Sequence, residues 1–135
     1  MKTILITLSL FLVSVIGLSQ QTERDGAFIV VDKEVHDFGS VEFGSPAICE
    51  FILTNTGTKP LNITTCKGSC GCTVPVCSQI PILPNGTYTM TVKYDTKREG
   101  PINKSVTIWS NAVNEPVKVV RIKGSVRPET TIMNK

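Results

Sequence analysis

The chain has 135 residues, five of them cysteines, and a formal net charge of +3 at pH 7. So small an excess of positive charge, with no cluster of basic residues, argues against binding to nucleic acid or to a membrane surface. A chain of this length corresponds to one domain and is long enough to bury a hydrophobic core.

The N-terminus has the pattern of an export signal. A basic start is followed by an uncharged apolar run over residues 3–17, which is short for a membrane span of about 20 apolar residues. Gly17 and Ser19 have the spacing that signal peptidase requires. We therefore expect residues 1–19 to be a cleaved signal peptide, with Gln20 as the first mature residue of a secreted or periplasmic protein. A retained anchor is the alternative. No cysteine follows the run to carry a lipid, and after cleavage we expect no membrane span.

A flexible polar lead-in is expected over residues 20–26, and beyond it strand patterns and turn signals fill the sequence, without a convincing helix. The prolines of residues 75–86 predict an extended crossing that ends in a tight turn. A connection over residues 95–101 would let the strands on either side of it pair as neighbours. The predicted strands cover residues 28–31, 35–41, 47–54, a stretch opening at 61–63, and residues 87–94, 104–110 and 117–126.

About seven short strands separated by turns predict an all-β fold, an immunoglobulin-like antiparallel β-sandwich. We expect it to cover residues 27–128, followed by a C-terminal tail over residues 129–135. A small closed barrel is the structural alternative. Within the strand predicted at residues 47–54, Cys49 is in phase with Phe51 and other apolar residues. Cys49 is therefore predicted to point into the core as a free thiol.

Several short motifs, taken in order, resemble a known bacterial family. They include His36-Asp37-Phe38-Gly39-Ser40-Val41, Asn55-Thr56-Gly57, Pro60-Leu61-Asn62-Ile63, Ser69-Cys70-Gly71-Cys72-Thr73-Val74-Pro75 and Val92-Lys93-Tyr94-Asp95. This pattern resembles the secreted family known as domain of unknown function fifteen-seventy-three, which is related to Hydin-like and major-sperm-protein-like immunoglobulin folds. The resemblance covers residues 31–126. It implies an immunoglobulin-like sandwich in envelope or secreted proteins, with no established activity. The chain departs from the family pattern at Cys77, where an aromatic residue is common, and at Asn85, where glycine is usual.

Four cysteines, Cys66, Cys70, Cys72 and Cys77, lie within one loop-rich segment. In an exported chain, such a cluster favours one or two disulfides that staple the segment. Because one intervening residue strains the bridge geometry, a disulfide between Cys70 and Cys72 is unfavourable. Partners outside that pair, such as Cys66 and Cys77, are therefore more plausible, although the sequence leaves the connectivity open.

Two chemical alternatives use the Cys-Gly-Cys motif. Thiolates of Cys70 and Cys72 would be ligands for a soft metal, copper or zinc, but no Cys-x-x-Cys pair accompanies them and the single histidine is distant. Thiol redox chemistry needs a thiol of lowered pKa, for which Lys67 is the nearby cation, without a following helix. Neither alternative replaces the structural interpretation, and we expect no cofactor.

Nothing in the sequence supports catalysis. His36 is the only histidine and stands beside Asp37 in a strand-like segment, where a lone histidine is more often structural than part of a catalytic triad. Acidic residues are scattered singly, and no glycine-rich phosphate loop precedes a helix. The sequence predicts a non-catalytic binding or structural module of the cell envelope, with an unidentified protein partner.

The candidate partner site lies on the last two predicted strands. Trp109 has the parity opposite to Val106 and Ile108, so we expect it to face outward. Val117 and Val119 are out of phase with the apolar residues that follow them, and would join Trp109 in an apolar patch. A β-bulge near Val119 would instead turn both valines inward, and we favour the bulge because bulges are frequent in antiparallel sheets.

Overall fold

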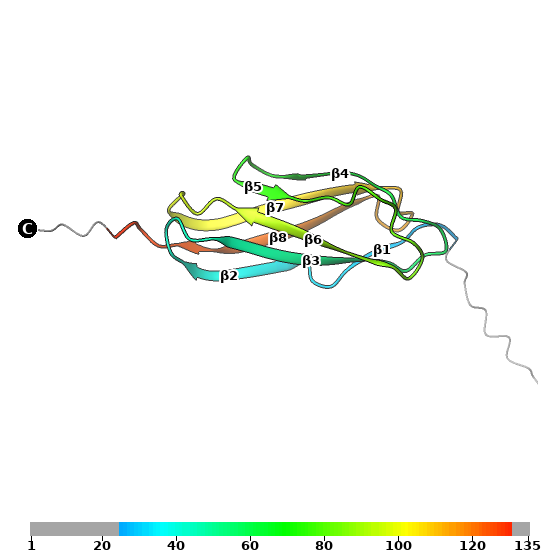
Figure 1. Ribbon diagram of the computed structural model, residues 1–135, viewed down its shortest axis with the longest axis horizontal. Helices are drawn as coiled ribbons and strands as arrows, with labels where there is room; N and C mark the ends of the chain where they lie inside the picture. The colour runs from blue at the N-terminus through cyan, green and yellow to red at the C-terminus, as the bar shows by residue number, and fades with distance from the viewer. Residues whose placement is uncertain (1–24, 131–135) are drawn as a thin grey trace, which may run out of the picture.

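The computed structural model describes residues 25–130, which form two four-stranded sheets lying face to face (Figure 1). The strand order is β1-β3-β6-β5 in the first sheet and β2-β8-β7-β4 in the second. The predicted immunoglobulin-like sandwich is confirmed. The predicted signal peptide and residues 20–24 and 131–135 lie outside the described residues. The strands are β1 (Ile29–Val31), β2 (Val35–Val41), β3 (Ala47–Asn55), β4 (Ile63–Gly68), β5 (Thr73–Pro75), β6 (Thr87–Tyr94), β7 (Gly100–Ser110) and β8 (Val117–Val126).

The core forms where the inward faces of the two sheets meet. Alternation in β3 and β6 sends every second side chain inward, and Phe51, Met90 and Val92 are fully buried. The second sheet supplies Val106, Ile108, Val120 and Ile122, which are also fully buried. Each such side chain stabilises the fold by roughly 1.5–3 kcal/mol relative to exposure. This two-layer core is what holds both outer faces and the connecting loops in place.

One strand pair differs from the predicted antiparallel arrangement. β2 pairs with β8 in parallel, whereas all other ladders among residues 25–130 are antiparallel. Parallel pairing needs a long crossover, and here β3 to β7 separate the two strands. The ladder is irregular between Asp37 and Ser40, where Gly39 has a φ of 63°. A Cβ on Gly124 would lie 2.7 Å from the Gly39 carbonyl oxygen, so this close approach requires glycine.

The prediction that the strands at residues 87–94 and 104–110 pair with each other is wrong. β6 pairs with β3 and β5, while β7 pairs with β8 and β4, so their connection crosses from one sheet to the other. A period of two specifies which face of a strand is buried, but not which strand lies beside it. β5 was also not expected as a separate strand, since its three residues are too few to show a pattern.

Candidate functional site

Trp109, Val117 and Val119 form an apolar patch on the outer face of the second sheet. Trp109 of β7 and Val117 of β8 are directly opposed, and Val119 is opposed to Thr107. Trp109 is 36% exposed, Val117 47% and Val119 37%. The β7–β8 ladder runs from Gly100 to Trp109 without a register shift. The bulge that we favoured from the sequence is therefore wrong.

The missing bulge is explained by Lys118. This side chain takes an inward position on β8 and is buried, and its Nζ lies 2.8 Å from Glu34 Oε1 and 3.0 Å from Glu115 Oε2. The hydrogen bond to Glu34 raises the pKa of Lys118, and the same bond lowers the pKa of Glu34. Because the ammonium reaches carboxylates at the end of the sandwich, β8 keeps strict alternation with a lysine in an inward position.

The structure adds Val35 to this surface. Val35 of β2 is 44% exposed and is opposed to Arg121 of β8, two residues beyond Val119 on the same face. The sequence did not point to it, because the parallel pairing of β2 with β8 could not be derived from the strand pattern. We call Val35, Trp109, Val117 and Val119 together the β7–β8 face.

Two basic residues border the β7–β8 face. Lys67 of β4 is opposed to Thr107, and Arg121 of β8 is opposed to Ser105. Both side chains are exposed, and within residues 25–130 neither takes part in an ion pair. The face therefore combines exposed apolar surface with positive charge that the rest of the described chain does not neutralise.

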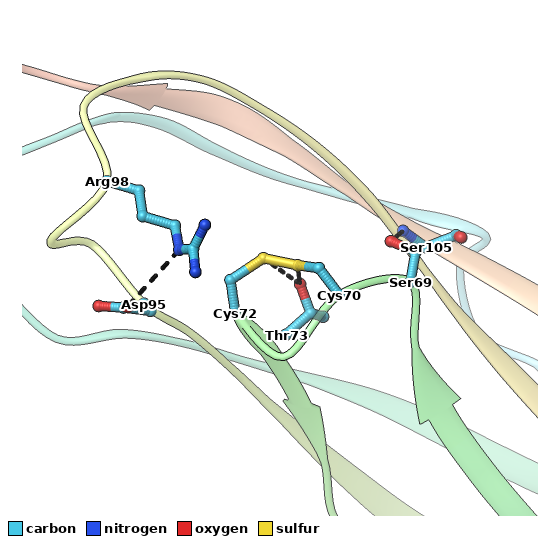
Figure 2. The surroundings of a disulfide bond; sticks show 7 residues. All are labelled: Ser69, Cys70, Cys72, Thr73, Asp95, Arg98 and Ser105. Carbon is cyan, nitrogen blue, oxygen red and sulfur yellow. Dashed lines mark hydrogen bonds and ion pairs between the residues drawn. A yellow bond between two sulfur atoms is a disulfide. The ribbon is translucent and has the colours of Figure 1, made fainter.

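The four clustered cysteines form two disulfides, Cys66–Cys77 and Cys70–Cys72. The expectation that Cys70 and Cys72 would not bond to each other is wrong. A turn through Gly71 brings their Cα atoms to 5.2 Å, within the range that disulfides need. The Thr73 hydroxyl lies 3.6 Å from Cys70 Sγ and 3.7 Å from Cys72 Sγ (Figure 2).

A groove of about 560 Å³ lies beside this turn, at one end of the first sheet. Cys72 forms part of its wall, together with Ile48 and Val74, and Lys93 and Lys97 contribute basic side chains. The loop after β6 also carries Arg98, which forms an ion pair with Asp95 at 3.7 Å. In Figure 2 the Arg98 side chain extends from this loop toward the Cys70–Cys72 disulfide. The groove thus joins a disulfide, apolar walls and positive charge.

Cys49 is buried and takes part in no disulfide among the described residues, and burial raises the pKa of its thiol to about 11. In the oxidised form, the sulfurs of Cys70 and Cys72 are bonded to each other and are not thiolate ligands. Residues 25–130 contain no group of three or more histidine, cysteine or acidic side chains placed to hold a metal ion. Within the same range, no helix has the length and apolar character of a membrane span.

Two facing sheets and short connecting turns define the protein as an immunoglobulin-like β-sandwich domain. A protein of unknown function from Porphyromonas gingivalis W83 is similar in fold, with a TM-score of 0.67 and 16% identity over 81% of this chain. The present chain spans only 51% of that protein. The ASH / PapD-like domain 7 of human CEP192 is similar with a TM-score of 0.59 and 11% identity, over 93% of this chain and 99% of that one. At these identities, the similarity concerns the fold alone.

The chain belongs to the family described as protein of unknown function (DUF1573), whose model matches residues 29–126. The family that the motifs resemble is thereby confirmed. No curated protein sequence matches the chain. The family is described as one of unknown function, so the surfaces of the domain are the basis for inferring what it binds.

Proposed function

We propose that this protein is an exported, non-catalytic binding module whose β7–β8 face binds a protein partner. The observation that carries the proposal is the placement of Trp109 directly opposite Val117, both exposed on the outer face of the second sheet. Tryptophan is enriched among the residues that dominate binding energy at protein interfaces. The two disulfides support an oxidising compartment, as expected for an exported protein.

The charges around the face define the chemistry of the partner. Lys67 and Arg121 border the apolar residues and lack an ion pair within residues 25–130. A partner with an apolar centre and acidic residues at its rim would complement this surface. Trp109 would contribute most of the affinity, while the two cations would mainly raise the association rate and fix orientation.

Trp109→Ala tests the proposal. The side chain faces outward but packs across the strands against Val117, so the variant should stay folded with a melting temperature lowered by no more than about 5 °C. Partner proteins captured from the envelope fraction of the source organism are identified, purified and titrated against each variant. Loss of an interface tryptophan commonly costs about 2 kcal/mol, which is about a thirtyfold weaker Kd.

Ile52→Ala is the matched control, because Ile52 is 41% exposed on the outer face of the other sheet. It should bind the partner as the wild type does. Arg121→Glu should slow association with an acidic partner and reduce the dependence of the rate on salt. Unchanged affinity of Trp109→Ala for every captured partner, with weakened binding of Ile52→Ala, would place the interface on the first sheet and overturn the proposal.

A further inference from the structure

The two disulfides play different parts in the fold. Cys66–Cys77 joins β4 of the second sheet to the segment that follows β5 of the first, with a sequence separation of 11. Cys70–Cys72 closes a turn around a single residue, with a sequence separation of 2. A loop this short removes less entropy from the unfolded chain than the longer loop closed by Cys66–Cys77. The Cys70–Cys72 bond is therefore the less important of the two for the fold.

The turn that carries Cys70 and Cys72 is also held in place without its disulfide. Ser69 and Ser105 exchange hydrogen bonds, with Ser69 N donating to the Ser105 carbonyl oxygen at 2.8 Å and Ser105 N donating to Ser69 Oγ at 3.1 Å (Figure 2). On the other side, Asp95 N donates to the Cys72 carbonyl oxygen at 2.8 Å. After reduction of the Cys70–Cys72 disulfide, these hydrogen bonds would keep the two sulfurs close together, so that the same disulfide could form again.

The surroundings of the two sulfurs favour exchange with a thiolate. Cys70 is half-buried and Cys72 is 3% exposed, so Cys70 is the more accessible of the two cysteines and the one at which we place the attack. The Thr73 hydroxyl lies within 3.7 Å of both sulfurs and is able to donate to whichever one leaves as a thiolate. Lys93 and Lys97 line the groove that Cys72 borders. Nearby cations stabilise a thiolate.

We propose that the Cys70–Cys72 disulfide is a thiol–disulfide exchange site that oxidises a dithiol carried on an acidic segment seated in the adjacent groove. The acidic character follows from the charge at the groove, whose lining holds the ammonium groups of Lys93 and Lys97 and the single carboxylate of Asp95, which is itself paired with Arg98. The apolar residues of the groove wall give the same segment a place for uncharged side chains. This site is separate from the β7–β8 face and does not depend on it.

The exchange proceeds in two displacements. One thiolate of the partner attacks Cys70 Sγ and forms a mixed disulfide, while the Cys70–Cys72 bond breaks and its electron pair leaves on Cys72 Sγ. The second thiolate of the partner then attacks the partner sulfur of the mixed disulfide, and Cys70 Sγ leaves as a thiolate. The partner dithiol is oxidised to a disulfide, and Cys70 and Cys72 are reduced to thiols that take up the two protons that the partner released.

The first test compares the two disulfides in one native molecule. The full protein is exposed to a dithiol at a concentration at which far-ultraviolet circular dichroism stays native, quenched with an alkylating reagent and mapped by mass spectrometry. Cys70 and Cys72 should become labelled at least tenfold faster than Cys66 and Cys77. Equal rates for the two pairs, or faster opening of Cys66–Cys77, would overturn the proposal.

The second test addresses the groove. Thioglycolate, 2-mercaptoethanol and cysteamine are anionic, neutral and cationic thiols, and their rates are compared per thiolate. Wild type should favour thioglycolate over cysteamine at low salt, and Lys93→Gln combined with Lys97→Gln should reduce this preference about two- to fivefold, as expected for exposed charges. Lys59→Gln, in the turn that follows the far end of β3, is the control and should keep the preference. A wild type without any preference, or an equal effect of Lys59→Gln, would rule out the groove as the docking site.

Discussion

Asn55 shows how a single buried polar side chain organises the loops at one end of the sandwich. Its Oδ1 accepts from Phe28 N at 3.2 Å and Gly57 N at 3.0 Å, and its Nδ2 donates to the carbonyl oxygens of Lys59 at 2.7 Å and Ile82 at 2.9 Å. The residue is completely buried. Both hydrogens of the Asn55 side-chain amide are therefore donated to hydrogen bonds. A buried amide stabilises a fold when its polar atoms are satisfied in this way.

Asn55→Ala should therefore lower the free energy of unfolding by about 3 kcal/mol or more, because several buried backbone groups lose a partner together. Urea unfolding, followed by the fluorescence of Trp109, measures the change. Thr54→Ala, at the neighbouring position of β3, is the control and should cost less than about 1 kcal/mol. An Asn55→Ala variant as stable as Thr54→Ala would mean that water replaces the amide without loss.

Cys49 should be chemically silent in the native protein. Burial raises the pKa of its thiol to about 11 from a usual value of 9.0. At pH 8 the thiolate fraction is then about a hundredfold lower in the folded chain than in the unfolded chain, since each pKa unit is a factor of ten. Labelling by a thiol reagent should be at least a hundredfold slower in native protein than in denaturant.

The raised pKa of Cys49 also lowers the stability of the fold at alkaline pH. The unfolded chain loses the thiol proton first, so unfolding becomes easier from about pH 9 to about pH 11. Rapid labelling of the native protein at pH 8 would show that Cys49 is not in the core.

At the level of the strands, the alternation of apolar and polar residues predicted where most strands lie, but it did not predict which strands pair with each other. The pattern of Ala47, Cys49, Phe51 and Leu53 predicted β3 almost to its ends, because one buried face imposes a period of two. The same pattern did not specify that β6 lies beside β3, nor that β2 runs parallel to β8. These pairings depend on contacts between segments far apart in the chain, which local periodicity does not encode.

β8 shows where a rule based on polarity alone fails. Val117 and Val119 are out of phase with the apolar residues that follow them in β8, and on that ground the sequence favoured a bulge. The carboxylates of Glu34 and Glu115 receive the Lys118 ammonium at the end of the sandwich, so the lysine occupies an inward position without a bulge. Glu34 is remote from Lys118 in sequence, and no local pattern brings the two together. The outward position of Val117 and Val119 on the β7–β8 face follows from these two ion pairs.

The Cys70–Cys72 bond is a further feature that the sequence did not predict. Spacing alone argued against it, because strain in so small a ring is the general expectation. The surrounding structure changes that expectation, because hydrogen bonds hold both ends of the turn in place. Ser69 bonds to Ser105 of β7, and Asp95 N donates to the Cys72 carbonyl oxygen. The sequence thus predicted that the four clustered cysteines form disulfides, whereas their pairing depends on the geometry of the turn.

At the scale of the whole molecule, Cys66–Cys77 connects the two layers at the edge formed by β4 and β5. In the chain-entropy model, a disulfide that closes a loop of about 12 residues contributes about 3 kcal/mol, and one that closes a three-residue loop about half as much. Replacing Cys66 and Cys77 together by alanine should therefore lower Tm by about 10–15 °C in a domain of this size.

The paired variant with Cys70 and Cys72 replaced by alanine is the matched control. It removes the same number of sulfurs and should lower Tm by about half as much, with a native circular dichroism spectrum. Differential scanning calorimetry of the two variants beside the wild type decides the matter. A larger loss of Tm in the control would mean that the Cys70–Cys72 bond, rather than Cys66–Cys77, is the main covalent support of the sandwich.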